Sequence, residues 1–266
     1  MTGMNERLAR ATEIVDEAMA AALAFFEARG SIAARAKGVQ DFVSEADTSV
    51  EQLIRARLAQ FFPDEAIVGE EMGGEAGEAY WIIDPIDGTT NFLRGSPLWG
   101  ISLGFVRAGE PELGVVALPA FGEVYSAAQG EGLYRNGQPF ERVVPFEEIR
   151  VLSLGDSAAI YLEEVAALNL GLRRAGFVVE SIQSTSVGLA FAARGTFDGH
   201  LQKQTTMWDL AGGAVIAREA GLAVRIGIKA GTESPWIAAA TPALMAATEA
   251  LWPEIALPVR ELVAAE

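Results

Sequence analysis

The order of the expected strands and helices changes near Pro145, and this change constrains the fold more than any other feature of the sequence. Before Pro145, apolar runs predict strands in succession, at 80–83, 99–106, 113–118 and 124–128. After it, strands and helices are expected to alternate, at 149–154, 161–175, 177–181, 187–194, 209–220, 222–226 and 236–240. Successive strands favour an antiparallel sheet, and alternation favours α/β layering. We therefore expect an α+β part at residues 1–145 and an α/β part at 146–266, sharing an interface because no flexible linker separates them.

Local signals define further elements in the first part. Apolar residues at three- and four-residue steps predict helices at 5–28 and 48–61. Thr48 and Glu51 have the spacing of a capping box for the second helix. Asn136-Gly137 predicts a tight hairpin, because both central residues of a type I′ turn need a positive φ.

Residue counts exclude several kinds of chemistry. The chain has no cysteine and one histidine, His200, so thiolate sites, cysteine nucleophiles and clusters of histidine ligands are impossible. We expect His200 to be structural or to lie at a pocket rim. The net charge of −16 repels phosphate backbones and anionic lipids, so neither nucleic acid nor a membrane is the expected partner. No targeting segment is recognisable, and the cytoplasm is the expected compartment.

The segment from Trp81 to Phe92 carries the strongest chemical signal. An apolar strand runs directly into Asp84 and Asp87, and charges at the end of a buried strand are costly unless they are paired. Pro85 between the carboxylates and Gly88 after them impose a tight turn. The run Gly88-Thr89-Thr90 offers backbone N–H groups and two hydroxyls, which form an anion cradle if a helix starts there.

Two other carboxylates end or begin apolar segments. Glu70 follows an apolar run and Asp209 precedes an apolar helix, although alone they are compatible with a surface loop and a helix N-cap. If both converge with Asp84 and Asp87, two carboxylates about 4 Å apart repel by about 4 kcal/mol at an effective dielectric of 20. Such a cluster needs protons or a cation, and oxygen ligands select Mg²⁺ over Zn²⁺. The acidic cluster beside an anion cradle therefore predicts a metal that joins the protein to a phosphate.

Together these residues resemble the inositol monophosphatase family of Mg²⁺-dependent, lithium-sensitive sugar and polyol phosphatases. The resemblance extends over roughly residues 5–252. It rests on Lys37-Gly38, Asp41-Phe42-Val43-Ser44, Asp47, Gly69-Glu70-Glu71, Trp81 to Phe92, Gly130-Glu131-Gly132, Asn136-Gly137 and Trp208 to Gly213. It implies a five-layer αβαβα sandwich of the sugar-phosphatase type and a homodimer.

The resemblance also implies a role for each site residue. One Mg²⁺ would be held by Glu70, Asp84 and the carbonyl of Ile86, and a second by Asp84, Asp87 and Asp209. A third, weaker ion would contact Glu70. Asp47 and Thr89 would activate the attacking water. Gly88, Thr89 and Thr90 would bind the phosphate. The substrate-binding residues would be Asp87, Ser184, Thr185 and Gln202. Water would attack phosphorus directly, without a phosphoenzyme, and Li⁺ would inhibit.

The chain departs from the family pattern where the substrate alcohol is expected. Gln202 stands where the family often has a glutamate, and Glu180 and Gln183 stand where an arginine and a glycine are usual. Glutamine still hydrogen-bonds but carries no charge. The sequence leaves two alternatives for Lys37, which are a contact with the site and a solvated position at the surface.

We therefore expect a phosphomonoesterase acting on inositol monophosphate or a similar polyol or sugar phosphate. The alternatives within the family are a 3′(2′),5′-bisphosphate nucleotidase, a histidinol-phosphate phosphatase and a fructose-1,6-bisphosphatase. The alternative outside the enzymes is a catalytically silent binding module. It is disfavoured because Asp47, Asp87 and Asp209 are all present.

Overall fold

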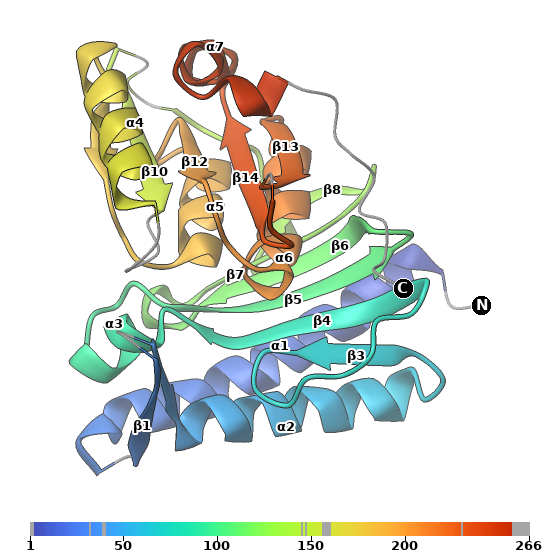
Figure 1. The fold of residues 1–266 in the computed structure, drawn as a ribbon. Coiled ribbons are helices and arrows are strands. Elements are labelled where there is room, and N and C mark those ends of the chain that lie inside the picture. Colours follow the sequence, from blue (N-terminus) through green and yellow to red (C-terminus); the bar gives the residue numbers. More distant parts are fainter. Residues whose placement is uncertain are drawn as a thin grey trace.

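The computed structural model describes residues 3–31, 33–38, 41–144, 146, 148–155, 161–229 and 231–256, with the backbone alone at 31, 38, 41 and 42. Pro145, at the expected boundary, lies outside the described residues. The described elements stack in layers of helices and sheets (Figure 1).

The larger sheet contains seven strands among the described residues, in the order β3-β4-β5-β6-β7-β8-β9. Their bounds are β3 (Ala66–Gly69), β4 (Ala79–Asp87), β5 (Gly100–Arg107), β6 (Glu110–Leu118), β7 (Glu123–Ala128), β8 (Gly132–Arg135) and β9 (Gln138–Pro139). Only the β3–β4 pair is parallel, so the predicted antiparallel sheet is confirmed. Asn136 and Gly137 both have positive φ, as the predicted turn between β8 and β9 requires.

The smaller sheet has the order β11-β10-β12-β14-β13. Its strands are β10 (Val151–Gly155), β11 (Val178–Glu180), β12 (Gly199–Gln202), β13 (Ala223–Ile228) and β14 (Pro235–Ala240). β10 is parallel to β11 and β12, whereas β14 is antiparallel to its two neighbours. A separate hairpin joins β1 (Ala34–Gly38) to β2 (Asp41–Ser44).

Helices form three of the layers. α1 and α2 cover the outer face of the larger sheet, α5 and α6 lie between the sheets, and α4 and α7 cover the smaller sheet (Figure 1). The helices are α1 (Met4–Glu27), α2 (Glu45–Phe61), α3 (Thr89–Arg94), α4 (Leu162–Arg174), α5 (Thr185–Arg194), α6 (Met207–Glu219) and α7 (Pro242–Leu251), with 3-10 turns at Arg29–Ser31, Pro119–Phe121 and Pro253–Ala256.

Buried apolar side chains fill the spaces between the layers. One cluster joins α1 and α2 to the larger sheet, a second joins α5 and α6 to both sheets, and a third lies under α4 and α7. Each cluster is continuous because every element turns an apolar face to its neighbour. This arrangement confirms the expected αβαβα sandwich, while the division of the chain at residue 145 stays a prediction.

The approach of α6 to the larger sheet depends on residues without side chains. A Cβ on Gly114 of β6 would lie 2.0 Å from the carbonyl oxygen of Gly212 in α6. The backbones of the helix and strand therefore touch here, which only glycine allows. This contact seats the first turn of α6 close to β4, so Asp209 comes near the end of that strand.

Two expectations differ from the structure. α2 begins one turn earlier than expected, and its capping box consists of Ser44 and Asp47, not of Thr48 and Glu51. Glu51 instead accepts hydrogen bonds from the N–H groups of Glu71 and Met72, so it fixes the loop after β3. β1, β2, β12 and α7 were not expected, and the first three of them are short strands without a clear apolar alternation.

Candidate active site

Asp84 and Asp87 lie at the end of β4, where the strand is irregular. Residues three apart in a regular strand point to opposite faces of the sheet. Here the pairing shifts, because Asp84 lies opposite Ser102 and Asp87 lies opposite Gly100, which leaves an extra residue on β4. This bulge turns both carboxylates to one side, and one oxygen of each lies within 4.8 Å of the other.

Asp209 completes this group from α6. One of its carboxylate oxygens lies within 4.8 Å of those of Asp84 and Asp87, so the three form a cluster in which one ion could contact all of them. The hydroxyl of Thr205 donates to Asp209 Oδ2 at 2.7 Å and orients this carboxylate. The structure therefore brings together three of the acidic residues that the sequence singled out.

Glu70 approaches the same cluster from the end of β3, which runs parallel to β4. The backbone N–H of Glu70 donates to the carbonyl of Ile83 at 3.1 Å. This hydrogen bond holds Glu70 beside β4, one residue before Asp84. Lys37 Nζ, from the β1–β2 hairpin, lies 2.9 Å from Glu70 Oε1 and 2.7 Å from Glu71 Oε1. Lys37 therefore contacts Glu70 and Glu71 while its side chain stays partly exposed, so it combines features of both alternatives.

The electrostatics of the cluster fit a cation. Burial, followed by repulsion from neighbouring carboxylates, raises the pKa of Asp84 well above its usual range. Burial is also the largest cause for Asp87, whose pKa rises to about 7, and for Glu70, whose pKa rises to about 7 despite Lys37. Carboxylates that repel in this way need a proton or a cation between them. Because the donors are all oxygens, a hard divalent ion fits them.

Asp47 and Thr89 form a pair beside the cluster. Asp47 is the buried third residue of α2, and its Oδ2 accepts hydrogen bonds from the backbone N–H and the hydroxyl of Ser44. The hydroxyl of Thr89, at the start of α3, is 3.2 Å from Asp47 Oδ1 and 3.2 Å from the carbonyl of Ile86. Burial is the main reason why the pKa of Asp47 is raised.

The first turn of α3 faces this pair. Gly88 is its N-cap and adopts φ of 94°, a left-handed conformation that glycine permits. The N–H groups of the first turn of a helix have no acceptor within the helix. The predicted cradle of Gly88, Thr89 and Thr90 therefore has the backbone form that the sequence suggested.

The start of α5 supports Asp87 from the other half of the chain. The backbone N–H of Ser186 and the hydroxyl of Ser184 both donate to Asp87 Oδ2, the latter at 2.9 Å. Thr185, between them, donates to Gln202 Oε1 at 2.8 Å. Ser186 and Thr205 were not recognised as contacts of the acidic residues. The sequence did carry a signal for both residues, because the hydroxyl-rich runs Ser184-Thr185-Ser186 and Thr205-Thr206 stand at the start of two apolar helices.

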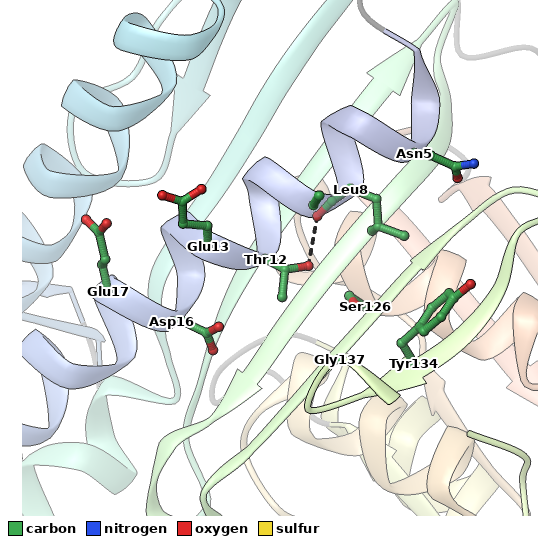
Figure 2. Close-up of a pocket in the computed structure, with 10 residues that line it drawn as sticks. Asn5, Leu8, Thr12, Glu13, Asp16, Glu17, Ser126, Tyr134 and Gly137 are labelled. Atoms are coloured by element: carbon green, nitrogen blue, oxygen red, sulfur yellow. Dashed lines mark hydrogen bonds between the residues drawn. The ribbon is translucent and has the colours of Figure 1, made fainter. Parts of the chain in front are cut away.

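A cavity of about 620 Å³ lies elsewhere, between α1 and strands β7 and β8 (Figure 2). Figure 2 shows Thr12 and Asp16 of α1 on one side and Tyr134 on the other. The carboxylates of Glu13 and Glu17, which also line it, both pair with Arg57. None of the expected site residues lines this cavity, so it is separate from the candidate active site.

The fold and the site define a class of protein. The architecture matches the solved structure of a SuhB protein from Bartonella henselae, with a TM-score of 0.80, 25% identity and coverage of 90% of this chain and 96% of that one. It also matches an IMPase from Thermotoga maritima, with a TM-score of 0.79, 28% identity and coverage of 94% and 98%. Together with the carboxylate cluster, these matches indicate the class of sandwich-fold phosphatases with an acidic metal site.

Sequence comparison identifies the family within this class. A model of the inositol monophosphatase family matches residues 2–259. An inositol-1-monophosphatase of Mycobacterium bovis is 33% identical over 278 residues, covering 92% of this chain and 93% of that protein. The chain belongs to the inositol monophosphatase family and is a phosphoric monoester hydrolase. Among the described residues, no helix is both long and apolar enough to span a membrane.

Proposed function

We propose that this protein is a Mg²⁺-dependent phosphomonoesterase that hydrolyses inositol monophosphate or a similar polyol or sugar phosphate. The observation that carries the proposal is the convergence of the buried Asp84 and Asp87 with the partly buried Asp209, which comes from a separate part of the chain. A buried cluster with this much mutual repulsion costs stability unless cations balance it. Its position beside the first turn of α3 suits a phosphate that is bound through those cations.

The proposed ligands are those that the family resemblance implies, and the proximity of Asp84, Asp87 and Asp209 supports one of the two sets. Glu70, Asp84 and the carbonyl of Ile86 would hold one Mg²⁺, whereas Asp84, Asp87 and Asp209 would hold a second. A third, weaker ion would contact Glu70. When bound, such ions lower the pKa of water and stabilise negative charge on the leaving oxygen.

Asp47 and Thr89 are proposed to handle the proton of the attacking water. The Thr89 hydroxyl donates to Asp47 Oδ1, so its oxygen lone pairs remain available to a water on the phosphate side. As that water loses its proton to the Thr89 oxygen, Thr89 passes its own proton to Asp47. The raised pKa of Asp47 suits a proton acceptor, because a base is most effective when its pKa is near the working pH.

The remaining residues would hold the two ends of the substrate. The N–H groups and hydroxyls of Gly88, Thr89 and Thr90 would donate to phosphate oxygens. Asp87, Ser184, Thr185 and Gln202 would border the alcohol side. Because Gln202 replaces a charged residue of the family pattern, we expect a substrate preference that differs from that for inositol 1-phosphate.

Fructose-1,6-bisphosphate is the second candidate substrate. A relative from Aquifex aeolicus, 37% identical over 198 residues and matched over 70% of this chain and 72% of its own length, is named a fructose-1,6-bisphosphatase/inositol-1-monophosphatase. A second phosphate needs additional positive charge. Lys203, next to Gln202 in the chain, and Lys229 both contact Glu164, at 2.9 Å and 3.0 Å, and the three groups together carry a net positive charge.

We also propose that the protein is a cytoplasmic homodimer that binds neither nucleic acid nor membranes. The net charge of −16 supports the absence of anionic partners. Light scattering coupled to size-exclusion chromatography would test the dimer, and a mass equal to one chain would contradict it.

The function is tested by measuring phosphate release from a panel of esters with Mg²⁺, with EDTA and with added Li⁺. The panel contains inositol 1-phosphate, fructose-1,6-bisphosphate, histidinol phosphate and a 3′,5′-bisphosphate nucleotide. We expect turnover that requires Mg²⁺, is abolished by EDTA, is inhibited by Li⁺ and is greatest for a polyol or sugar phosphate. Preference for the nucleotide or for histidinol phosphate would contradict the proposed substrate class. Turnover in EDTA would contradict the metal-dependent mechanism.

A further inference from the structure

The single histidine of the chain is buried behind the site in a position that the proposed mechanism does not use. His200 and Gln202 are two residues apart on β12, so their side chains share one face of the strand. His200 is 1% exposed. Its Nε2 lies 3.1 Å from Gln202 Oε1, and its Nδ1 lies 3.1 Å from the hydroxyl oxygen of Ser153 on β10.

The surrounding groups determine where the protons lie. Gln202 Nε2 donates to the carbonyl of Gln204 at 3.1 Å, and this carbonyl can only accept. The amide oxygen of Gln202 therefore faces Thr185 and His200, and it accepts from both. It follows that His200 carries a proton on Nε2. Burial is the main reason why the pKa of His200 falls to about 4, so the ring is neutral and Nδ1 accepts from Ser153.

Two glycines provide the space that these side chains occupy. A Cβ on Gly188 of α5 would lie 2.3 Å from His200 Nδ1, and a Cβ on Gly155 of β10 would lie 2.2 Å from Gln202 Oε1. The imidazole and the amide therefore lie directly against the neighbouring backbone. Such fitted contacts hold a side chain in one orientation, because any other orientation would clash.

The pair is connected to the acidic cluster through the first turn of α5. Gln202 holds the hydroxyl of Thr185, whose oxygen is 3.3 Å from that of Thr205, and Thr205 donates to Asp209. The residues on either side of Thr185 donate to Asp87. A single helical turn thus links the buried pair to two carboxylates that come from different halves of the chain.

We propose that His200 and Gln202 form a neutral buried pair that positions the first turn of α5, and through it Asp87 and Asp209. In this role Gln202 is a positioning residue that acts on the site through Thr185, in addition to bordering the alcohol side of the substrate. The proposal rests on the proposed function only for the identity of the site. It also gives a reason for the amide at position 202, because a carboxylate would turn an oxygen towards the Gln204 carbonyl and lose the hydrogen bond there.

The protonation state of His200 is tested directly by nuclear magnetic resonance. Because the chain has one histidine, ¹⁵N-histidine labelling of the full-length protein gives the signals of a single imidazole. At pH 7 we expect a neutral ring with the proton on Nε2. A proton on Nδ1 in a neutral ring, or a charged imidazolium, would overturn the proposal. In Gln202→Glu we expect an imidazolium, because the new carboxylate accepts the Nε2 hydrogen bond and stabilises the charged ring.

The positioning role is tested with Gln202→Met and His200→Phe, which keep side-chain bulk but remove the hydrogen bonds. Calorimetric titration with Mg²⁺ alone is expected to show about tenfold weaker binding or more, as is typical when a group that orients metal ligands is lost. With the best ester, we expect kcat to fall while KM changes little. A higher KM with unchanged Mg²⁺ binding would overturn the positioning role, because it would show that Gln202 acts only on the substrate.

The matched control is Thr248→Val, which removes a buried hydroxyl that donates to the Leu244 carbonyl in α7. This variant should bind Mg²⁺ as the wild type does, so weaker binding there would mean that lost stability alone explains the effect. If the other variants fail to fold, the wild-type resonance experiment still decides the proposal. Absence of turnover on every ester would contradict the proposed function, whereas the resonance and Mg²⁺ titrations would still report on the buried pair.

Discussion

Asp84 and Asp87 are almost completely shielded from solvent, and they accept hydrogen bonds from N–H and hydroxyl groups. Asp84 Oδ1 accepts from the backbone N–H of Ile86 at 3.0 Å, and Asp87 Oδ2 accepts from Ser184 and Ser186. These donors orient the carboxylates but do not neutralise them. At the scale of single residues, the site is therefore shaped for a group that brings positive charge.

Replacing Asp87 with asparagine is expected to lower kcat by several orders of magnitude and to leave the fold intact. The amide keeps the shape of the side chain but removes one charge from a cluster that must hold cations. Phosphate release at saturating Mg²⁺ measures the effect. Asp16→Asn, the same change on the exposed face of α1, is the control and should keep wild-type activity. An Asp87→Asn variant with more than half of the wild-type activity would contradict the site assignment.

The stability of the metal-free protein is expected to fall as the pH rises from about 5 to 8. Asp87 and Glu70 have pKa values near 7 in the folded state and ordinary values when unfolded. Between these values the folded protein binds more protons than the unfolded chain, so the free energy of unfolding decreases with rising pH. Each such carboxyl contributes a slope of at most about 1.4 kcal/mol per pH unit.

Thermal unfolding in EDTA, followed by calorimetry across this pH range, measures the slope. Added Mg²⁺ should raise Tm most at the high end of the range, because cations bind the deprotonated carboxylates of the folded state. A Tm that rises with pH in EDTA would show that these carboxylates are not strained in the absence of metal.

At the scale of elements, the site depends on how closely α6 approaches the larger sheet. The backbone contact between Gly114 and Gly212 fixes the helix at a shorter distance than side chains would allow. The bulge in β4 turns its two carboxylates towards this helix. The backbone shapes of β4 and α6 therefore determine where the three carboxylates of the acidic cluster lie.

Gly114→Ala is expected to move α6 away from the sheet and to weaken Mg²⁺ binding. The new methyl group would overlap the Gly212 carbonyl, and overpacking of this kind costs about 1–3 kcal/mol. Denaturant unfolding and calorimetric titration with Mg²⁺ measure the two effects. Gly30→Ala is the matched control, because a Cβ there has no described atom within 4 Å. Wild-type Mg²⁺ binding in Gly114→Ala would show that α6 does not need this close contact.

At the scale of the whole molecule, the middle helical layer joins the two halves. α6 packs against strands of both sheets, and the second apolar cluster contains residues from both halves of the chain. The acidic cluster also combines residues of both halves, because Asp84 and Asp87 come from the first half and Asp209 comes from the second. The site is therefore complete only when both halves are folded together.

We expect both halves to unfold in one transition. Leu103→Ala, in the cluster under α1 and α2, and Leu244→Ala, in the cluster under α4 and α7, should each lower the stability by about 2–5 kcal/mol. Far-ultraviolet circular dichroism and tryptophan fluorescence should give the same midpoint in each variant. A second, separate transition in either variant would show that the halves unfold independently.

The sequence by itself determined the layer types and most of the acidic residues of the site. Apolar periodicity is a local property, so α1 and the strands β4 to β7 could be predicted, as could the turn at Asn136-Gly137. The acidic residues stood out because each interrupts or borders an apolar segment. Their convergence was expected only as a condition, because a single chain does not show which segments meet in space.

Only the tertiary structure decided the contacts between distant segments. The Ser44–Asp47 capping box differs from the expected one by a single helical turn, and local spacing fits both. The hydrogen bonds from Ser184 and Ser186 to Asp87 join residues almost one hundred positions apart. The buried contact of His200 with Gln202 depends on space left by Gly155 and Gly188, which lie on other elements. These contacts follow from packing, and packing is specified by the whole chain at once.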